Sequence, residues 1–337
     1  MMADQKVRLG YIGAGRFSRS RLLPNLKMIP DVDLVAVSNS SEESSTNVAR
    51  EFGFARVEKD WADIVSADDI DAVIVGTRTA LHPEMVLPIL DAGKHVLSLN
   101  AIARDLDGAR AMLRKSHEHP ALVSLVFPVQ FYLHEDAMMR WLLAEDFVGQ
   151  ILHVFDYWYT PYFGLGSQFE IAHRWFGEHT KVFGYRRGFE VTGGGVDHQQ
   201  REVRPESNLV QAELENGATI TYVHSTIAGG SALSRFEIYG DKGVIACYSN
   251  GQSMSGFFGA KSGEKELKPI EVPDHLRGNW EDPRGVTVEA DFVEAIRGTN
   301  EPSLAIPRFI DGVKLLEFAE AWRASTQSGT WVQLPTG

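Results

Sequence analysis

Two glycines and a small residue follow the first apolar run of the chain, in the segment Gly13-Ala14-Gly15-Arg16-Phe17-Ser18. Where a strand turns into a helix, the first glycine permits a tight turn and the second lets backbone N–H groups approach an anion. A third small residue, here Ser18, lets the helix pack close to the strand. The pattern predicts a dinucleotide site with Gly13, Gly15, Arg16 and Phe17 as binding residues. The alternative is a turn that serves packing alone.

The second apolar run ends in Ser38-Asn39-Ser40-Ser41. Enzymes that bind NAD usually place a carboxylate here for the ribose hydroxyls, whereas enzymes that bind NADP avoid it and often supply an arginine. Hydroxyl and amide groups tolerate a 2′-phosphate better than a carboxylate does, and Arg16 could reach it. We therefore expect NAD or NADP as cofactor, with Ser38, Asn39 and Ser40 near the ribose, and the residues favour NADP. These side chains could instead cap the next helix.

The elements that must position these loops form a regular series in the first third of the chain. Helical patterns of about 10–15 residues separate short apolar runs, which is typical of a parallel sheet covered on both faces. Strands are predicted at Val7–Ile12, Leu34–Val37, Ala72–Val75, His95–Leu97 and Ala121–Phe127. The sequence therefore predicts an α/β fold whose residues 1–125 form a doubly wound Rossmann domain.

Residues 126–337 have a different rhythm and are predicted to form a second domain. Asn216-Gly217 indicates a hairpin, because both residues accept positive φ, and Asp241-Lys242-Gly243 indicates another tight turn. The segment Asn250–Arg284 is rich in Gly, Pro and charged residues and is expected to be mostly loop. An antiparallel sheet is predicted from Ile151–Thr160, Lys181–Phe189, Leu209–Glu215, Ala218–Thr226, Arg235–Tyr239 and Val244–Tyr248, followed by helices near Val286–Arg297 and Arg308–Ser325.

Several motifs, in order, resemble the Gfo/Idh/MocA oxidoreductase family: "RLGYIGAGRFS", "DIDAVIVGTRTALHPEMVLPILDAGKHVL", "ENGATITYVHST" and "FEIYGDKGVI". The resemblance is clearest over Val7–Leu113. It implies a Rossmann domain, a second α/β domain on a large, mostly antiparallel open sheet, NAD or NADP, and sugar, polyol or cyclitol substrates. It also implies a homodimer or homotetramer joined through the C-terminal sheet.

One family signature is altered after the "GKHVL" strand. The family usually has Glu-Lys-Pro there, with a catalytic lysine, whereas this chain has Leu99-Asn100-Ala101. An amide can donate a hydrogen bond to a substrate oxygen, but it cannot ionise and exchange protons. We take Asn100 as a candidate catalytic residue that orients the substrate.

A second signature, Asp-x-Gly-x-His-x-x-Asp ahead of an Arg-Trp pair, is altered as well. Anchored on "RWFG" and Gly166, the alignment puts Gly164, Gln168 and Ile171 where the family has Asp, His and Asp. Gln168 becomes a candidate for positioning a substrate oxygen. A second alignment, starting at "GGG" in 193–195, makes Asp197 and His198 a displaced acid/base pair.

Other polar residues could serve the site. Thr77, Arg78 and His82 match the family's T-P-N-x-x-H positions and would border the nicotinamide ribose, although His82 could equally make only a structural hydrogen bond. His173 is a candidate proton carrier because its ordinary pKa lies near neutrality. Glu170 would share a helix face with it, which could also be a plain solvent-facing turn.

Aromatic residues gather between 153 and 189, where 12 of 37 residues are Phe, Tyr or Trp against 10% in the whole chain. Sheet core or an interface between subunits accounts for most of them. A few could stack on a ligand, with Tyr157, Tyr159 and Tyr162 favoured because they also carry hydroxyl groups.

Composition and charge exclude several classes of protein. With 33 basic and 45 acidic residues, the formal charge of −12 argues against nucleic acid as a partner. One cysteine and no apolar run of about 18 residues predict a cytoplasmic protein that neither crosses nor binds a membrane. The leading hypothesis is an NAD(P)-dependent oxidoreductase acting on a small hydroxylated or carbonyl molecule, without a metal. A nucleotide-retaining lyase, isomerase or hydrolase and a non-catalytic binding protein stay open as alternatives.

Overall fold

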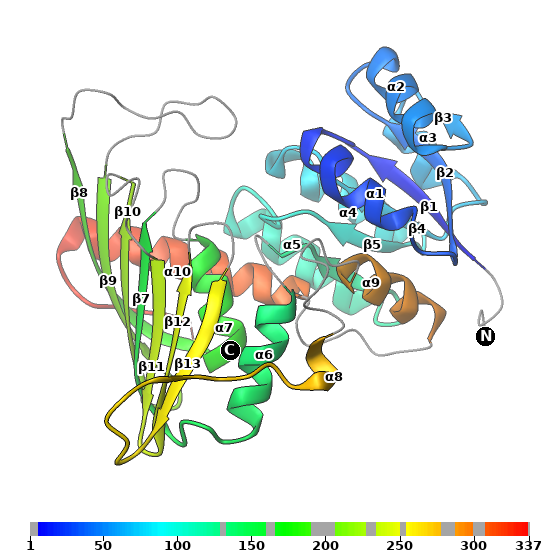
Figure 1. Ribbon diagram of the computed structural model, residues 1–337. Coiled ribbons are helices and arrows are strands. Elements are labelled where there is room, and N and C mark those ends of the chain that lie inside the picture. The colour runs from blue at the N-terminus through cyan, green and yellow to red at the C-terminus, as the bar shows by residue number, and fades with distance from the viewer. Residues whose placement is uncertain are drawn as a thin grey trace. The chain divides into compact units, whose positions relative to one another are not determined.

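The computed structural model describes residues 6–128, 133–159, 166–189, 206–226, 234–249, 254–277, 287–298 and 307–335. The chain divides into two units (Figure 1). Unit 1 comprises Met1–Val129 and Asp282–Leu316, and unit 2 comprises Gln130–Glu281 and Glu317–Gly337. The sequence assigned all of 126–337 to the second domain, but the segment 282–316 clusters with the first because its helix contacts the first strand.

Unit 1 contains the predicted parallel sheet. Its strand order is β3-β2-β1-β4-β5-β6, so the chain reverses direction across the sheet between β1 and β4. The central strands are buried on both faces because they are apolar throughout. The strands are β1 (Val7–Ile12), β2 (Val32–Ser38), β3 (Arg56–Val57), β4 (Ala72–Val75), β5 (His95–Ser98) and β6 (Ser124–Val126).

The helices of unit 1 cover this sheet. A π-helical turn, Ser18–Leu22, follows the glycine-rich loop and leads into α1 (Leu23–Leu26). The other helices are α2 (Glu42–Phe52), α3 (Trp61–Ser66), α4 (His82–Asp91), α5 (Leu106–Glu118) and α9 (Thr287–Arg297). Local sequence sets their ends: the Ser41 hydroxyl accepts a hydrogen bond from Ser44 N–H at the start of α2, and Gly53 ends that helix at φ 86°.

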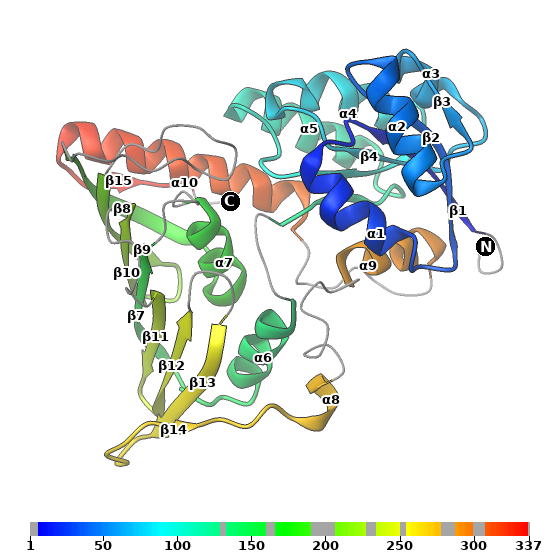
Figure 2. The same cartoon turned by 45° about the horizontal axis from the view of Figure 1, so that its top comes forward.

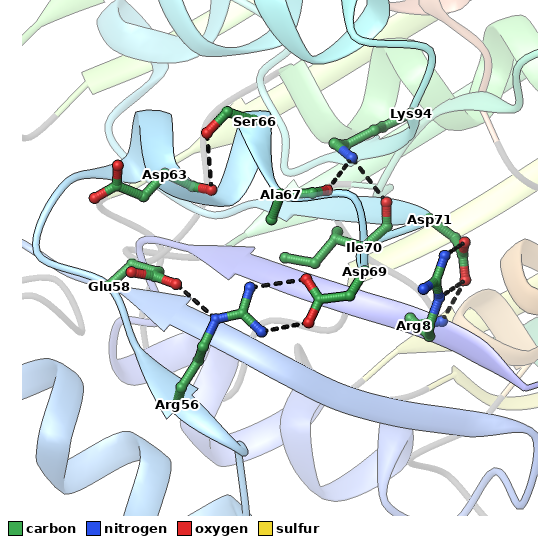
Figure 3. A network of polar contacts seen from close by, with 10 residues as sticks. All are labelled: Arg8, Arg56, Glu58, Asp63, Ser66, Ala67, Asp69, Ile70, Asp71 and Lys94. Atoms are coloured by element: carbon green, nitrogen blue, oxygen red, sulfur yellow. Dashed lines mark hydrogen bonds and ion pairs between the residues drawn. The ribbon is translucent and has the colours of Figure 1, made fainter.

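The amino ends of the unit 1 strands are joined by a polar network (Figure 3). Asp71 accepts three hydrogen bonds from Arg8, from its backbone N–H, Nε and Nη2. Arg56 donates to Glu58 and, through two nitrogens, to Asp69. The buried Lys94 Nζ donates to the carbonyls of Ala67 and Ile70 at 2.6 and 2.8 Å.

Unit 2 contains a nine-stranded sheet in the order β14-β13-β12-β11-β7-β10-β9-β8-β15. Its pairs are antiparallel except β7 with β10, which confirms the prediction of a mostly antiparallel sheet. The strands are β7 (Ile151–Tyr159), β8 (His179–Gly188), β9 (Glu206–Leu214), β10 (Thr219–Ser225), β11 (Ser234–Gly240), β12 (Gly243–Ser249), β13 (Met254–Lys261), β14 (Lys268–Pro269) and β15 (Val332–Gln333).

Helices lie against one face of this sheet, named the inner face here (Figures 1 and 2). Phe169 contacts Tyr222 with ring centroids 4.9 Å apart, and Trp175 contacts Phe236 at 5.5 Å. No described helix covers the outer face. The helices of unit 2 are α6 (Leu133–Ala144), α7 (Gly166–Phe176), α8 (Asp274–Arg277) and the later part of α10 (Phe309–Ser328).

Both predicted turns of this sheet are confirmed, while the predicted loop over Asn250–Arg284 is wrong in its described part. Gly217 adopts φ 84° between β9 and β10. The supposed loop contains β13, which pairs with β12 over most of its length. Glycines hid this strand, because a Cβ on Gly259 would lie 2.6 Å from the Phe147 ring and no side chain fits there.

Candidate functional site

The glycine-rich loop lies at the carboxyl end of β1, beside the ends of β2 and β4. Gly13 N–H donates to Ser38 O, and Gly76 N–H donates to Ile12 O, both at 2.8 Å. The loop therefore sits where the strand order reverses, which is where ligands bind in open α/β sheets.

The two glycines of the loop have separate reasons to lack a side chain. Gly13 has φ 82°, and a Cβ there would lie 2.5 Å from Thr77 Cγ2 and 2.8 Å from Thr77 N. Gly15 is exposed and a Cβ would meet nothing within 4 Å, so a ligand can approach its Cα closely, while its N–H donates to Gly13 O at 2.9 Å. Arg16 and Phe17 are exposed beside it. A tight turn followed by an open, exposed backbone fits the pyrophosphate of a dinucleotide.

The structure gives Asn39 a defined task in holding this loop. Its Oδ1 accepts a hydrogen bond from Ala14 N–H at 2.6 Å, and its Nδ2 donates to Ser44 Oγ at 3.0 Å. Ser38 is buried, whereas Ser40 is exposed. The alternative of helix capping is realised one residue later, by Ser41. Asn39 thus fixes the loop, and of the three predicted ribose residues Ser40 is the one that faces solvent.

Thr77, Arg78 and His82 follow the next strand, β4. Thr77 is half-buried against Gly13, and Arg78 is exposed. His82 is fully buried: its Nε2 lies 3.1 Å from Thr77 O, and its Nδ1 lies 3.1 Å from both Ser98 Oγ and Ile102 O. Burial lowers the pKa of His82 against the raising effect of these carbonyls. A neutral ring that donates to Thr77 and accepts from Ser98 has no nitrogen left, so the geometry favours the structural role for His82.

Asn100 follows β5 in the same unit. Its side chain is half-buried, and the peptide bond between Asn100 and Ala101 is cis. Leu99 N–H donates to Val75 O at 2.9 Å and so ties this turn to the end of β4. Asn100 therefore belongs to the same edge of the parallel sheet as the glycine-rich loop.

Gln168 belongs to unit 2, near the start of α7. It is 2% exposed, and neither amide atom makes a direct hydrogen bond of normal geometry to a described residue. Its neighbour is Asp156 on the inner face of β7, which is 3% exposed. Burial raises the pKa of Asp156 to about 7, and the nearby Gln168 amide opposes that rise. Gln168 is thus an interior residue next to a carboxyl group.

His173 lies on the same helix but not on the same side. Five residues separate it from Gln168, which rotates the two side chains about 140° apart on an α-helix. Glu170 and Arg174 occupy the His173 side and form a buried ion pair at 3.8 Å. The structure therefore does not bring His173 and Gln168 together toward one reacting atom.

The aromatic segment is divided between the two faces of the sheet. Phe169 and Phe176 are buried in the inner layer, whereas Tyr157 and Tyr159 alternate with buried residues and lie on the outer face. The Arg235 guanidinium stacks 4.0 Å above the Tyr157 ring. Both tyrosines therefore point away from Gln168 and α7. Tyr162, Asp197 and His198 lie outside the described residues.

Asp156 is the residue that the sequence analysis missed. The segment His153-Val154-Phe155-Asp156-Tyr157-Trp158 alternates between the faces, and Asp156 shares the parity of the buried Val154 and Trp158. A carboxylate at an inward position of a strand is unusual unless it is paired or used. This inward position in the alternating pattern was the sequence signal that could have identified Asp156. Within the described ranges, no three His, Cys, Asp or Glu side chains are grouped to hold a metal ion.

None of the described helices is long and apolar enough to cross a membrane. Solved structures resemble the whole chain in fold. A levoglucosan dehydrogenase in complex with NADH matches with a TM-score of 0.80 at 19% identity, covering 99% of this chain and 100% of that one. The WlbA dehydrogenase from Bordetella pertussis, in complex with NADH and UDP-GlcNAcA, matches with a TM-score of 0.77 at 17% identity, covering all of both chains.

Comparison of sequences identifies the family as well as the fold. A 4-carboxy-2-hydroxymuconate-6-semialdehyde dehydrogenase from Sphingobium sp. is 26% identical over 330 residues, covering 92% of this chain and 96% of that protein. Residues 7–127 match the model of the oxidoreductase family's NAD-binding Rossmann fold, and residues 164–334 match that of its C-terminal alpha/beta domain. The chain therefore belongs to the Gfo/Idh/MocA family of oxidoreductases and carries its NAD-binding Rossmann domain.

Proposed function

We propose that this protein is an NAD(P)-dependent dehydrogenase or reductase that transfers a hydride between the nicotinamide and a hydroxyl or carbonyl carbon of a small molecule. The observation that carries the proposal is the loop of residues 13–18, in which Gly13 packs tightly against Thr77 while the space beside the Gly15 Cα is open. Such a loop at the reversal of strand order is built for a dinucleotide.

The residues around this loop divide the work of holding the cofactor. Backbone N–H groups that follow Gly15, at Arg16 and Phe17, would receive the pyrophosphate, Ser40 the adenosine ribose, and Thr77 with Arg78 the nicotinamide ribose. No carboxylate stands at 38–41, and Arg16 is exposed nearby, which supports a preference for NADP. When bound, the nicotinamide supplies the hydride chemistry, and the protein orients the substrate.

The substrate is proposed to be a sugar, polyol or cyclitol, or a related hydroxylated or carbonyl compound. The named relatives support this range, since one acts on levoglucosan by its name and another on a semialdehyde. Asn100 would hydrogen-bond the reacting oxygen, because an amide can both donate and accept. Since Asn100 cannot ionise, the proton has to be carried by another residue.

Because Asn100 cannot ionise, a second function stays a candidate: the protein could bind the nucleotide without net redox turnover. Nicotinamide absorbance followed over a panel of polyols, sugars and aldehydes separates the two. A change in absorbance with any of them supports the dehydrogenase. Unchanged absorbance together with tight nucleotide binding favours the second candidate.

Nucleotide binding is tested with two matched glycine variants. Gly13 and Gly53 both have positive φ, but a Cβ on Gly53 would meet nothing within 4 Å. We expect Gly13→Ala to weaken binding of NADH and NADPH by about tenfold or more, since the loop must move away from Thr77, while Gly53→Ala leaves it unchanged. Fluorescence titration measures both. Failure of the wild-type protein to bind either nucleotide overturns the proposal.

The oligomeric state and the cellular location are proposed from other observations. We propose a homodimer or homotetramer joined through the outer face, where Tyr185 and Leu209 are exposed on the neighbouring strands β8 and β9 and Tyr239 is exposed on β11. Analytical ultracentrifugation of the wild type and of Leu209→Arg tests it, with a monomeric wild type as the contrary result. A cytoplasmic location stays a prediction, based on the single cysteine, Cys247, which is buried and forms no disulfide bond.

A further inference from the structure

The helix that follows the glycine-rich loop begins at the proposed phosphate site. Residues 16–26 are helical throughout, and Arg19 N–H donates to Gly15 O at 3.0 Å, so the loop runs into the helix without a break. The N–H groups of the first turn and the helix dipole both favour an anion at this end. A negative charge buried beside the same helix would repel that anion. Acidic groups packed against this helix therefore affect how tightly a nucleotide binds.

One carboxyl group is buried beside this helix. Glu289, in the first turn of α9, is fully buried, and α9 packs against α1 and β1 within unit 1 (Figure 2). Its Oε1 accepts a hydrogen bond from Asn25 Nδ2 at 3.4 Å, whereas its Oε2 has no hydrogen-bond partner in the described part of the chain. An ionised oxygen without a partner is costly in an interior, so the surroundings favour the protonated acid.

The neighbours of Glu289 do not neutralise its charge. They are Tyr11 on β1, Arg21 in the turn before α1, and Asn25 on α1. Arg21 attracts the carboxylate from a distance, and no described basic residue forms an ion pair with it. Tyr11 is buried near Ser18, and this burial raises its pKa above the ordinary value, so it stays neutral. A carboxylate at this position would thus be a net negative charge within the fold.

Glu289 changes its charge near neutral pH, while its neighbours do not. Burial raises its pKa to about 7, against the opposing effects of its own backbone N–H, Arg21 and Asn25. The guanidinium of Arg21 stays charged throughout this range, and the amide of Asn25 does not titrate. The charge of this set therefore depends on Glu289 alone.

The distance to the phosphate site sets the size of the electrostatic effect. Asn25 follows Arg16 by nine residues, which is about 14 Å along a helix that rises 1.5 Å per residue. Two unit charges about 14 Å apart at an effective dielectric constant of about 20 repel each other enough to change an affinity severalfold. Screening by salt is weak for a buried charge, so much of this effect should persist in solution.

We propose that Glu289 is a positioning residue for the nucleotide site: it holds the helix through Asn25, and its ionised form weakens nucleotide binding by repelling the pyrophosphate. This inference rests on the proposed binding of NAD(P). Because the bound anion favours the neutral acid, binding near pH 7 takes up part of a proton from the solvent. That proton goes to the Glu289 carboxylate, and no other reactant is needed. Glu289 acts along the helix rather than by contact with the nucleotide.

Fluorescence titration with NADH between pH 5.5 and 8.5 tests this inference. NADH is suitable because its pyrophosphate keeps its charge over this range, whereas the 2′-phosphate of NADPH titrates near pH ~6. We expect the wild-type dissociation constant to rise about three- to tenfold from the low to the high end. Glu289→Gln should keep the low-pH affinity throughout, because its amide is neutral and still offers an acceptor to Asn25.

Glu294→Gln is the matched control, because it removes a half-buried carboxylate from the same helix, and it should follow the wild type. Asp156, the buried carboxyl group of unit 2, titrates in all three proteins and cancels from the comparison. If Glu289 only supported the fold, Glu289→Gln would shift the affinity equally at every pH and keep the wild-type pH dependence. That result overturns the inference, as does a wild-type affinity that is constant over this range.

Calorimetry measures the proton directly. With NADH near pH 7, in buffers of different ionisation enthalpy, the wild type should take up about 0.3–0.5 proton more than Glu289→Gln, as a three- to tenfold linkage requires. Equal uptake by the two proteins overturns the inference. If only NADPH binds, the same comparison holds, because the 2′-phosphate titrates equally in both. Failure of the wild type to bind either nucleotide overturns the proposed function instead, so the two failures are distinguished.

Discussion

Two regions of the molecule treat their polar groups in opposite ways: the amino ends of the unit 1 strands, and the inner face of unit 2 around Gln168. At the amino ends of the unit 1 strands, Arg8, Asp71 and Lys94 all have partners at hydrogen-bond distance (Figure 3). On the inner face of unit 2, the Gln168 amide and the Trp158 indole Nε1 make no hydrogen bond of normal geometry to a described residue, although the amide lies close enough to Asp156 to oppose the rise in its pKa. Unsatisfied polar atoms in an interior cost roughly 1–3 kcal/mol each, so a fold that serves stability alone would pair or remove them.

This contrast distinguishes polar groups that stabilise the fold from polar groups that are available for function. The network of unit 1 lies at the amino ends of parallel strands, opposite the edge that carries the glycine-rich loop, and its bonds only tie strands and turns together. Around Asp156, the inner face of unit 2 keeps a carboxyl group that forms no ion pair with a described residue and an amide that makes no hydrogen bond of normal geometry to one. Groups left available in this way are expected where a protein binds or moves something, because strain and unmet bonds concentrate at functional sites.

The largest effect on stability is expected when the titratable group of Asp156 is removed. Its pKa is about 7 in the folded protein against 3.8 in its ordinary state. Stability from the bound proton is fully present below pH ~4 and is lost as pH rises toward 7. This loss amounts to about 4 kcal/mol at about 1.4 kcal/mol per pKa unit. Asp156→Asn does not titrate, so we expect its free energy of unfolding to gain about that much on the wild type between pH 4 and 7.

Urea unfolding at several pH values measures this difference. Glu289 on α9, whose pKa burial also raises to about 7, titrates in both proteins and cancels from the comparison. A constant difference between Asp156→Asn and the wild type across that range would show that Asp156 is charged throughout, and the contrast between the units would then fail.

The matched change in unit 1 should have the opposite sign. Burial raises the pKa of Asp71, but hydrogen bonds and charge from Arg8 outweigh it and lower the pKa overall. Asp71→Asn weakens a three-bond contact with Arg8, and we expect a loss on the order of 2–3 kcal/mol at neutral pH. The loss should shrink as pH falls below about 4, because the wild-type carboxylate then protonates too. Thermal or urea unfolding checks it, with Lys6→Ala, an exposed pair with Asp33, expected to change stability by about 0.5 kcal/mol or less.

The fold was predictable because local patterns of apolar residues and turn residues specify its strands and turns. Ala72–Val75 is apolar on both faces and Val7–Ile12 is apolar except at Arg8, and the predicted bounds of both strands match the structure. The hairpin at Gly217 was equally explicit. Strand β13 was hidden because its glycines serve the packing of Phe147, a contact 112 residues away from Gly259 in sequence. Such a contact leaves no local pattern.

The site was predictable only where local rules decide it. Gly13 and Gly15 are required by backbone geometry, so the sequence marks them. Asn39 and His82 were recognised as polar residues near the loop, but what their atoms bond depends on strands and turns brought together by folding. Asp156 belongs to no motif. Its importance comes from burial and from the helix that lies over it, which a single sequence does not display.

Lysine 94 offers a direct test of the paired state in unit 1. Its Nζ is buried and donates to two carbonyl oxygens that follow α3, at Ala67 and Ile70. Lys94→Met keeps the apolar stem but leaves both carbonyls without this donor. We expect a loss of about 2 kcal/mol in the free energy of unfolding, measured in urea. An unchanged midpoint would mean that water replaces the ammonium without cost.

The same replacement in unit 2 should have the smallest effect and sharpens the contrast most. Gln168→Met has a similar volume and exchanges an amide that makes no described hydrogen bond of normal geometry for an apolar side chain. Because no bond of normal geometry is lost and a buried polar group is removed, we expect stability to change by less than about 1 kcal/mol, in the stabilising direction. A stability loss equal to that of Lys94→Met would show that Gln168 is a structural group like those of unit 1.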